Sequence, residues 1–326
     1  MDKISIVVPC YNEEEALEYF YTEMKKVMKK MKEVAFELLF VDDGSEDQTL
    51  AMLRKMAELD PRCRYLSFSR NFGKEAAIYA GLSHASGNYV AIMDADLQDP
   101  PELLPEMYQM LYWENWDCVA ARRKNREGEP RLKSFLSDCF YKVINKLSKI
   151  QLVSGARDFR MMTRRMVNGV LQMSEYNRFS KGLFQWVGFR TAWIEFPNQE
   201  RCAGKSKWPL RKLISYSLEG ITGFSVAPLS LAAVMGLLFC VISFFMIGFI
   251  AFRTLFFGDP VKGWPSMACI IFLVGGIQLF CIGILGEYLA KTYLETKRRP
   301  IYILREISED NCKEISRGPG YERTAD

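Results

Sequence analysis

The chain has 326 residues, of which 49% are hydrophobic and 25% are charged, and its formal net charge is +4. This composition excludes disorder, a collagen repeat and a coiled coil as descriptions of the whole chain. Two long runs, 226–252 and 264–286, contain no Asp, Glu, Lys or Arg. They exclude a simple cytosolic enzyme, because an apolar run of about 20 residues is long enough to span a membrane.

Short apolar runs alternate with helical patterns over the first 121 residues. The runs typical of buried strands are 4–8, 36–41, 64–68, 89–93 and 118–121. Helices are predicted from a cap at Asn12 to about Lys32, and then at 47–59, 74–84 and 100–113. The alternation predicts an α/β fold with a mostly parallel sheet and helices on both faces. In such a sheet, ligands bind at the carboxyl ends of the strands.

The rest of the chain has a different pattern. Residues 122–165 are basic and are expected to be helical. A basic amphipathic stretch at 207–222, with Trp208 at its start, predicts a helix lying on a membrane surface. A helix packed on the soluble domain is the alternative for that stretch. Two transmembrane helices are predicted at about 226–252 and 264–289.

Charge is unevenly distributed along the chain. Residues 1–120 carry a net charge of −10 and residues 121–225 a net charge of +13. A basic segment beside a span indicates contact with anionic headgroups or phosphates, and the absence of a nucleic-acid-binding motif argues against nucleic acid as a partner. Basic residues flank both spans on the sides away from the connecting loop, 253–263. The positive-inside rule therefore predicts a multi-pass protein of the inner (cell) membrane, with the bulk of the chain and both termini cytoplasmic.

Polar clusters follow the first two predicted strands. Pro9 and Tyr11 can build a flat slot for a nucleobase, although an ordinary strand-to-helix turn uses similar residues. The adjacent carboxylates of Asp42 and Asp43 can accept hydrogen bonds from ribose hydroxyls or a base N–H. A helix N-cap followed by the turn glycine Gly44 explains one of these two acids equally well.

A third cluster follows the fourth predicted strand and is strongly acidic. Asp94, Asp96 and Asp99 lie within six residues together with the amide of Gln98. Oxygen ligands of this kind suit Mg²⁺ or Mn²⁺, which commonly bridge substrate phosphates. Asp99 also has a structural explanation as the cap of the helix that begins at the Pro-Pro pair.

Taken in order, these clusters resemble the family 2 inverting glycosyltransferases, and most closely the branch that makes polyprenyl-phosphate sugars. The resemblance extends over roughly residues 1–300. It rests on the runs VVPCYNEE at 7–14, VDDGSEDQT at 41–49, SRNFGKEAA at 69–77, MDADLQDPPE at 93–102, SGARDFRMMTRR at 154–165 and RCAGKSKWPLRKL at 201–213. It implies a nucleotide-sugar-binding domain of the glycosyltransferase A type.

The resemblance also implies roles for individual residues. Nucleotide contacts are implied for Pro9, Tyr11, Glu13, Asp42, Asp43 and Asp94. The metal would lie among Asp94, Asp96 and Gln98, and Asp158 would join Asp96 as a catalytic residue near the reacting sugar. Asp158 can alternatively be a structural partner for Arg157, Arg160 or a backbone turn. Phosphates of donor or acceptor would be faced by Arg122, Arg131, Arg201 and Lys207.

These inferences divide the chain into four parts. A cytoplasmic glycosyltransferase domain is expected at 1–205, an interfacial helix at 206–224, the two spans within 225–290, and a cytoplasmic tail with a disordered end at 291–326. Glycines in the second span allow close helix contact, either within a hairpin or between subunits of a homo-oligomer.

The expected reaction is inverting transfer of glucose from UDP-glucose to undecaprenyl phosphate. The resemblance leaves other donors open, namely GDP-mannose, UDP-galactose and UDP-GlcNAc. A processive polysaccharide synthase is disfavoured because Gln185 and Trp186 are not part of a Gln-x-x-Arg-Trp motif and only two spans are predicted. A non-catalytic membrane scaffold is disfavoured by the intact acidic clusters.

Overall fold

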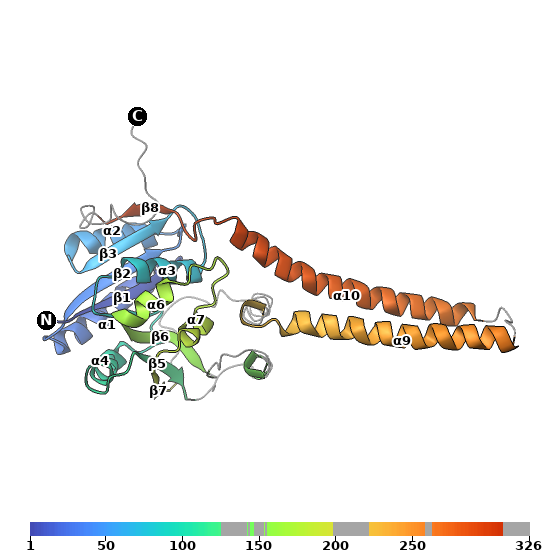
Figure 1. Ribbon diagram of the computed structural model, residues 1–326. Coiled ribbons are helices and arrows are strands. Elements are labelled where there is room, and N and C mark those ends of the chain that lie inside the picture. Colours follow the sequence, from blue (N-terminus) through green and yellow to red (C-terminus); the bar gives the residue numbers. More distant parts are fainter. Residues whose placement is uncertain are drawn as a thin grey trace.

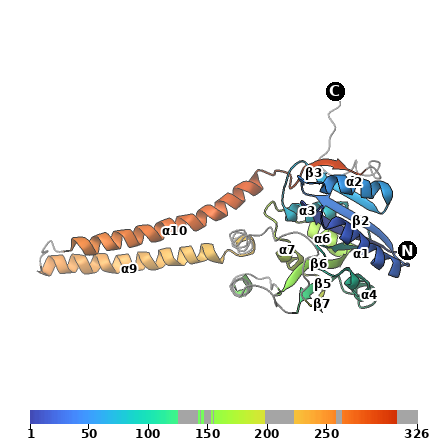
Figure 2. The same ribbon diagram turned by 180° about the vertical axis from the view of Figure 1, so that it is seen from behind.

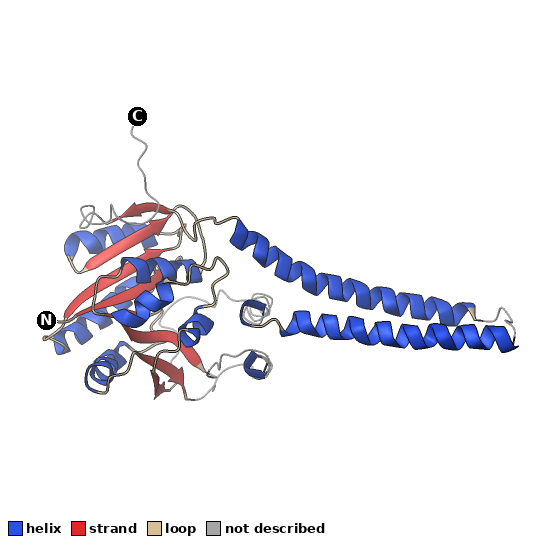
Figure 3. Ribbon diagram, in the orientation of Figure 1, coloured by secondary structure: helices blue, strands red, loops and turns tan. Residues whose placement is uncertain are grey.

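The computed structural model describes residues 1–124, 142, 144–146, 153, 155–197, 222–257 and 263–308. Figure 1 shows an α/β domain from which two long helices extend side by side, and Figure 2 shows the same arrangement from behind. All the strands lie in the α/β domain, at one end of the molecule (Figure 3). The predicted fold class is confirmed for this domain.

The domain is built on one eight-stranded sheet with the strand order β7-β5-β6-β4-β1-β2-β3-β8. The strands are β1 (Lys3–Cys10), β2 (Ala35–Asp42), β3 (Cys63–Phe68), β4 (Tyr89–Ile92), β5 (Cys118–Arg123), β6 (Ala156–Thr163), β7 (Thr191–Phe196) and β8 (Leu304–Ile307). Strands β1 to β4 are mutually parallel where they pair, and β5 pairs parallel with β7. Two strands run the other way: β6 is antiparallel to β4 and β5, and β8 is antiparallel to β3.

Helices cover both faces of the sheet. They are α1 (Leu17–Lys30), α2 (Thr49–Leu59), α3 (Lys74–His84), the short 3₁₀ helix η1 (Pro101–Leu103), α4 (Leu104–Trp113), α6 (Arg164–Leu171) and α7 (Ser180–Trp186). Alternate residues of β1 point to opposite faces. Ile6 and Val8 belong to the core under α1 and α4, whereas Val7 belongs to the core under α3 and α6.

Helix α3 packs unusually closely on the sheet, and this contact matters for the site. A Cβ built on Gly81 would lie 2.1 Å from Cγ1 of Val7 in β1. Only a residue without a side chain allows this approach. The close contact holds the second half of α3 against β1.

The two long helices are α9 (Ala227–Phe257) and α10 (Trp264–Thr296). Each contains a segment long and apolar enough to cross a membrane, at Ala227–Met246 and Leu273–Thr296. Little of either segment is buried within the structure, at 6% and 0%. Both predicted apolar helices are therefore present, and most of their surface has no protein partner among the described residues.

The chain returns to the α/β domain after α10. Strand β8 completes the sheet beside β3, and Arg54 of α2 binds Glu306 of β8 through two hydrogen bonds of 2.8 and 2.7 Å. Tyr302 stacks on Phe68, with ring centroids 5.0 Å apart. Residues 301–308 are therefore part of the domain.

Several sequence-based expectations are wrong in detail. Asn12 does not cap α1: it has φ of +53°, and the helix begins at Leu17 without a side-chain cap. The expected helical segment 122–165 contains strand β6, and β7 and β8 were not expected. The amphipathic stretch 207–222 lies outside the described residues except for Thr222.

Candidate active site

The topology explains why the polar clusters meet. Strands β2 and β3 lie on one side of β1 and β4 on the other, so the strand order changes direction at β1. The backbone N–H of Met93 donates to the carbonyl of Val7 at 3.0 Å, which places the end of β4 beside the end of β1. A change of this kind at the carboxyl edge is the usual ligand site of such sheets.

The loops after β1 and β2 are joined by hydrogen bonds. The backbone N–H of Asn12 donates to Oγ of Ser45 at 2.9 Å, and Oδ1 of Asn12 accepts from the backbone N–H of Glu46 at 2.9 Å. The backbone N–H of Glu13 donates to Oγ1 of Thr49 at 2.8 Å. Pro9, Tyr11 and Glu13 remain partly exposed on this joined pair of loops.

The two acids at the end of β2 have internal partners. Asp42 is 1% exposed and accepts hydrogen bonds from the Ser45 backbone N–H at 3.1 Å and from the Ser67 hydroxyl at 2.8 Å. Asp43 is 3% exposed and accepts from the backbone N–H groups of Phe72 at 2.6 Å and Gly73 at 2.9 Å. Neither acid caps a helix, since α2 and α3 begin without a side-chain cap, and Asp43 instead holds the backbone just before α3.

Asp94 and Asp158 are brought together by the antiparallel strand β6. Ile92 of β4 pairs with Arg160 of β6, so the residues that follow Ile92 lie near those that precede Arg160. Nζ of Lys74 lies 2.7 Å from Oδ1 of Asp94 and 2.7 Å from Oδ2 of Asp158. One ammonium group therefore bridges the two acids.

The bridge sets the charge state of its members. Burial by itself would raise the pKa of Asp158, but Lys74, Lys181 and Arg160 outweigh it and hold that pKa well below its usual range. Burial would likewise lower the pKa of Lys74, but Asp158 and Asp94 raise it above its ordinary value. Asp158 is thus an anion and Lys74 a cation at neutral pH.

The rest of the acidic motif forms a turn stabilised from β6. Oδ1 of Asp96 accepts from the backbone N–H of Gln98 at 3.1 Å, and Leu97 between them has φ of +54°. Asp99 is 1% exposed and accepts from Nε of Arg157 at 2.8 Å, while another nitrogen of Arg157 lies 3.4 Å from Oε1 of Gln98. Asp99 therefore joins the loop after β4 to β6.

The donor set suits a hard divalent cation. Asp94, Asp96 and Gln98 offer only oxygen ligands, as Mg²⁺ and Mn²⁺ prefer. Across the described parts of the chain, no three His, Cys, Asp or Glu side chains are arranged as a metal cluster. Such a cation would keep water or phosphate oxygens as its other ligands, which is the usual arrangement for Mg²⁺ at phosphate substrates.

Of the predicted phosphate-binding residues, the structure describes one. Arg122 at the end of β5 forms an ion pair with Glu195 of β7, and both side chains are about 40% exposed, at 38% and 41%. Arg131, Arg201 and Lys207 lie outside the described residues.

No role was predicted for Lys74, and Arg157 was expected only as an alternative structural partner of Asp158, whereas it donates to Asp99. Lys74 lies in the run 69–77 and Arg157 in the run 154–165, both of which carry the family resemblance. Lys74 is 20 residues from Asp94 and 84 from Asp158, so no local pattern links them. The signal that was available is a lysine at the first position of a helix that starts at the carboxyl edge of the sheet.

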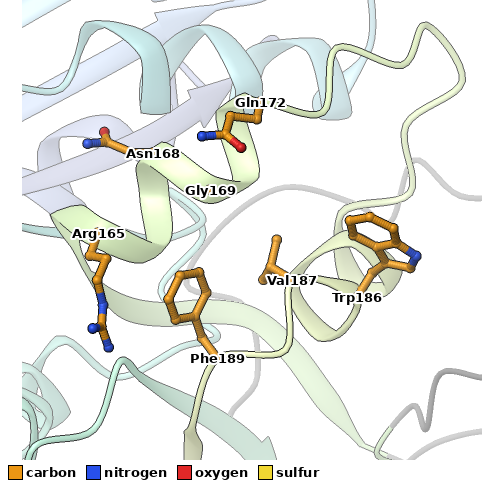
Figure 4. A pocket seen from close by; sticks show the side chains of 7 residues that line it. All are labelled: Arg165, Asn168, Gly169, Gln172, Trp186, Val187 and Phe189. Carbon is orange, nitrogen blue, oxygen red and sulfur yellow. The ribbon is translucent and has the colours of Figure 1, made fainter.

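A separate pocket of about 490 Å³ has none of these acids in its lining, and Figure 4 shows the side chains that line it. It is lined by one face of α6 with Arg165, Asn168, Gly169 and Gln172, and by Trp186, Val187 and Phe189 at the end of α7. None of the predicted site residues lines it.

The model of the family described as "Glycosyl transferase family 2" matches residues 5–171, the segment that holds all of these acids. The chain belongs to glycosyl transferase family 2. The "Prophage bactoprenol glucosyl transferase homolog" of Escherichia coli (strain K12) is 41% identical over 94% of this chain and 100% of that relative. The "SfII prophage-derived bactoprenol glucosyl transferase" of Shigella flexneri is 42% identical over 95% of this chain and 99% of that relative. These family members match both the domain and the apolar helices.

The solved structures that this chain matches are more distant in sequence than these relatives. Glucosyl-3-phosphoglycerate synthase from Mycobacterium tuberculosis, in complex with Mn²⁺, UDP-glucose and phosphoglyceric acid, matches with a TM-score of 0.42 and 22% identity. The match covers 68% of this chain and 78% of that one. A likeness at this level carries no argument about the site.

Proposed function

We propose that this family 2 glycosyltransferase transfers glucose from UDP-glucose to undecaprenyl phosphate, with inversion, at the cytoplasmic face of the cell membrane. The observation that carries the proposal is the match to bactoprenol glucosyl transferases at 41% and 42% identity over nearly the whole chain. The acidic site and the two apolar helices are the two parts that a membrane-lipid glucosyl transfer needs.

The nucleotide would occupy the carboxyl edge of β1 and β2. Pro9, Tyr11 and Glu13 are partly exposed there and would contact the base, beside Asp42. Asp43 would act through the position of α3, because its carboxylate is bound by the Phe72 and Gly73 backbone. The diphosphate would then reach the loop after β4.

The acids after β4 would hold a divalent cation. Asp94, Asp96 and Gln98 are its proposed ligands, and the cation would stabilise the negative charge that develops on the leaving diphosphate. Asp158, kept ionised by Lys74, would lie near the sugar and stabilise positive charge at the reacting carbon. The acceptor phosphate oxygen is already anionic and therefore needs no strong general base. Cationic groups would position it, with Arg122, Arg131, Arg201 and Lys207 as the candidates.

The apolar helices would anchor this chemistry in the bilayer as a hairpin. Their segments Ala227–Met246 and Leu273–Thr296 have the length and composition of spans. Because the chain before α9 and the strand after α10 both contact the same domain, both ends of the hairpin would lie on one side of the membrane. The basic residues flanking the helices support the cytoplasm as that side.

A donor panel with the purified chain tests the proposal. The chain is incubated with undecaprenyl phosphate, Mg²⁺ or Mn²⁺, and UDP-glucose, UDP-galactose, UDP-GlcNAc or GDP-mannose in turn, and the lipid product is identified by mass spectrometry. One hexose per lipid from UDP-glucose is the expected product. Preference for another donor would replace the assigned sugar, more than one sugar per lipid would indicate a polysaccharide synthase, and no product with any donor would overturn the proposal.

Substitution of the proposed metal ligand gives the matched control. Asp96→Ala should abolish transfer while the protein still inserts and folds. Glu23→Gln, on the exposed side of α1 where Glu23 pairs with Lys26, changes one acid away from the site and should leave transfer unchanged. Full activity of Asp96→Ala would overturn the metal assignment.

A further inference from the structure

The Lys74 ammonium engages both oxygens of the Asp94 carboxylate. Nζ lies 2.7 Å from Oδ1 and 2.9 Å from Oδ2 of Asp94, and 2.7 Å from Oδ2 of Asp158. The lysine side chain is 33% exposed and the two acids are 24% and 20% exposed. The bridge is therefore reached by solvent but is held by three charge-assisted contacts at normal hydrogen-bond length.

The backbone of Lys74 is fixed, so the bridge can change only through its long side chain. Asp43 holds the N–H of Gly73, the residue before Lys74, and Gly73 has φ of +99°. Gly81 seats the same helix against Val7. The four-carbon stem of lysine is the flexible part of this arrangement.

A divalent cation that uses Asp94 as a ligand meets this ammonium. Both carboxylate oxygens are already in contact with Nζ, Oδ1 through the ion pair and Oδ2 through a hydrogen bond. Two cations on one carboxylate repel each other at close range, so metal binding at Asp94 weakens the contact between Asp94 and Lys74. Asp158, within β6, offers the lysine a second anionic partner, because Nζ already lies 2.7 Å from its Oδ2.

We infer that Lys74 competes with the divalent cation for Asp94 and withdraws to Asp158 when the metal enters. Lys74 thus occupies the acidic motif as long as no divalent cation is bound to Asp94. The inference rests on the proposed function only in placing a metal at Asp94. It makes Lys74 a positioning residue, acting through Asp94 and Asp158, that the acidic motif alone does not reveal.

Metal binding without donor or lipid tests this directly. Mn²⁺ is titrated into the purified full-length protein in detergent, without nucleotide, and free Mn²⁺ is followed by electron paramagnetic resonance. Lys74→Met keeps the length of the side chain and removes its charge, and Mn²⁺ should bind about two- to fivefold more tightly, as expected for loss of a partly exposed ion pair. Lys74→Arg keeps the charge and should stay close to wild type.

Two further lysines separate direct competition from general charge. Lys181 acts on Asp158 by its charge but donates its hydrogen bond to the carbonyl of Ala156 at 3.1 Å, and Lys26 pairs with Glu23 on exposed α1. Lys181→Met and Lys26→Met should each change Mn²⁺ affinity less than twofold. Equal affinity in wild type and Lys74→Met, including no binding in both, overturns the inference, as does an equal gain in Lys181→Met or Lys74→Arg.

A measurement on the wild-type chain guards against a Lys74→Met variant that fails to fold. Acetylation of Lys74 by an amine-reactive ester is compared with that of Lys26 by peptide mass spectrometry, with and without Mn²⁺. Mn²⁺ should change the Lys74 rate relative to Lys26, and an unchanged ratio at saturating Mn²⁺ contradicts the inference. Neither experiment contains a sugar donor. A failure of the donor panel can therefore be distinguished from a failure of the Lys74 inference.

Discussion

The carboxylate of Asp43 accepts the backbone N–H of Gly73 at 2.9 Å, so the end of β2 holds the start of α3. Burial raises the pKa of Asp43 to about 6, and the N–H groups of Phe72 and Gly73 offset this only in part. An unfolded Asp has a pKa of about 3.9. The native state therefore binds more protons than the unfolded state between these values, and the contribution of Asp43 to stability falls as pH rises through them.

Asp43→Asn keeps an acceptor oxygen without the charge. We expect this variant to gain stability relative to wild type as pH rises from 4 to 7, by on the order of 2 kcal/mol. Thermal unfolding midpoints of both proteins across that range measure the difference. Parallel curves for the two proteins would show that Asp43 does not titrate in this window.

Gly44 lies where the loop after β2 touches the loop after β3. A Cβ at this position would lie 2.4 Å from the carbonyl carbon of Arg70, and φ is +69°. Gly44→Ala should cost about 2–4 kcal/mol, from strain and overpacking together. Gly188→Ala is the control, since its φ of +71° is similar but nothing lies within 4 Å of the added Cβ. Gly188→Ala should cost only about 1 kcal/mol of stability. Equal losses of stability in the two variants would show that the contact with Arg70 contributes nothing to the cost of Gly44→Ala.

The buried Asp99 depends on Arg157 for its charge. One of its oxygens accepts from Arg157, and Oδ2 is buried without a hydrogen-bond partner in the described structure. Arg157→Met should cost about 2–3 kcal/mol. Burial already raises the pKa of Asp99, so without Arg157 it should take up a proton more readily. The loss should thus be larger at pH 8 than at pH 5, and adding Asp99→Asn should recover part of it. A pH-independent loss would contradict this account.

The segment after α10 is held to the domain more by aromatic packing than by charge. Tyr302 stacks on Phe68 with an interplanar angle of 17°, and Arg54 and Glu306 are 46% and 27% exposed. Tyr302→Ala should cost about 2–3 kcal/mol. Glu306→Ala should cost less than about 1 kcal/mol, because exposed ion pairs contribute little. Thermal unfolding of the two variants measures which loses more stability. A larger loss in Glu306→Ala would show that the ion pair holds the segment more strongly than the aromatic packing does.

The parallel part of the fold could be predicted from the sequence because its strands are continuous apolar runs. The helix predicted at 74–84 coincides with α3. Strand β6 was not predicted because its sequence contains arginines, and a hydrophobicity pattern assigns arginines to the solvent-exposed surface. Arg160 is 1% exposed and lies 4.0 Å from the ring centroid of Phe184. A buried arginine of this kind is recognised only when its partners are known.

The acidic motifs could likewise be predicted, but their connections could not. Each cluster is a local pattern after a strand, whereas the Lys74 bridge depends on β6 lying antiparallel beside β4. Asp43 illustrates the same limit, because its partners are backbone groups 29 and 30 residues away. Strand β8 is four residues long and includes Arg305 and Glu306, which hide it from any hydrophobic pattern.

The place of β8 in the chain has a consequence for biosynthesis. The edge of the sheet beside β3 is filled by residues that leave the ribosome only after both α9 and α10 have been made. Until then β3 presents an unpaired edge, and such edges invite pairing with other chains. A nascent chain stalled within α9 or α10 would therefore carry an α/β domain in which the edge of β3 is unpaired. How long that edge stays unpaired depends on how quickly the two apolar helices are synthesised and inserted.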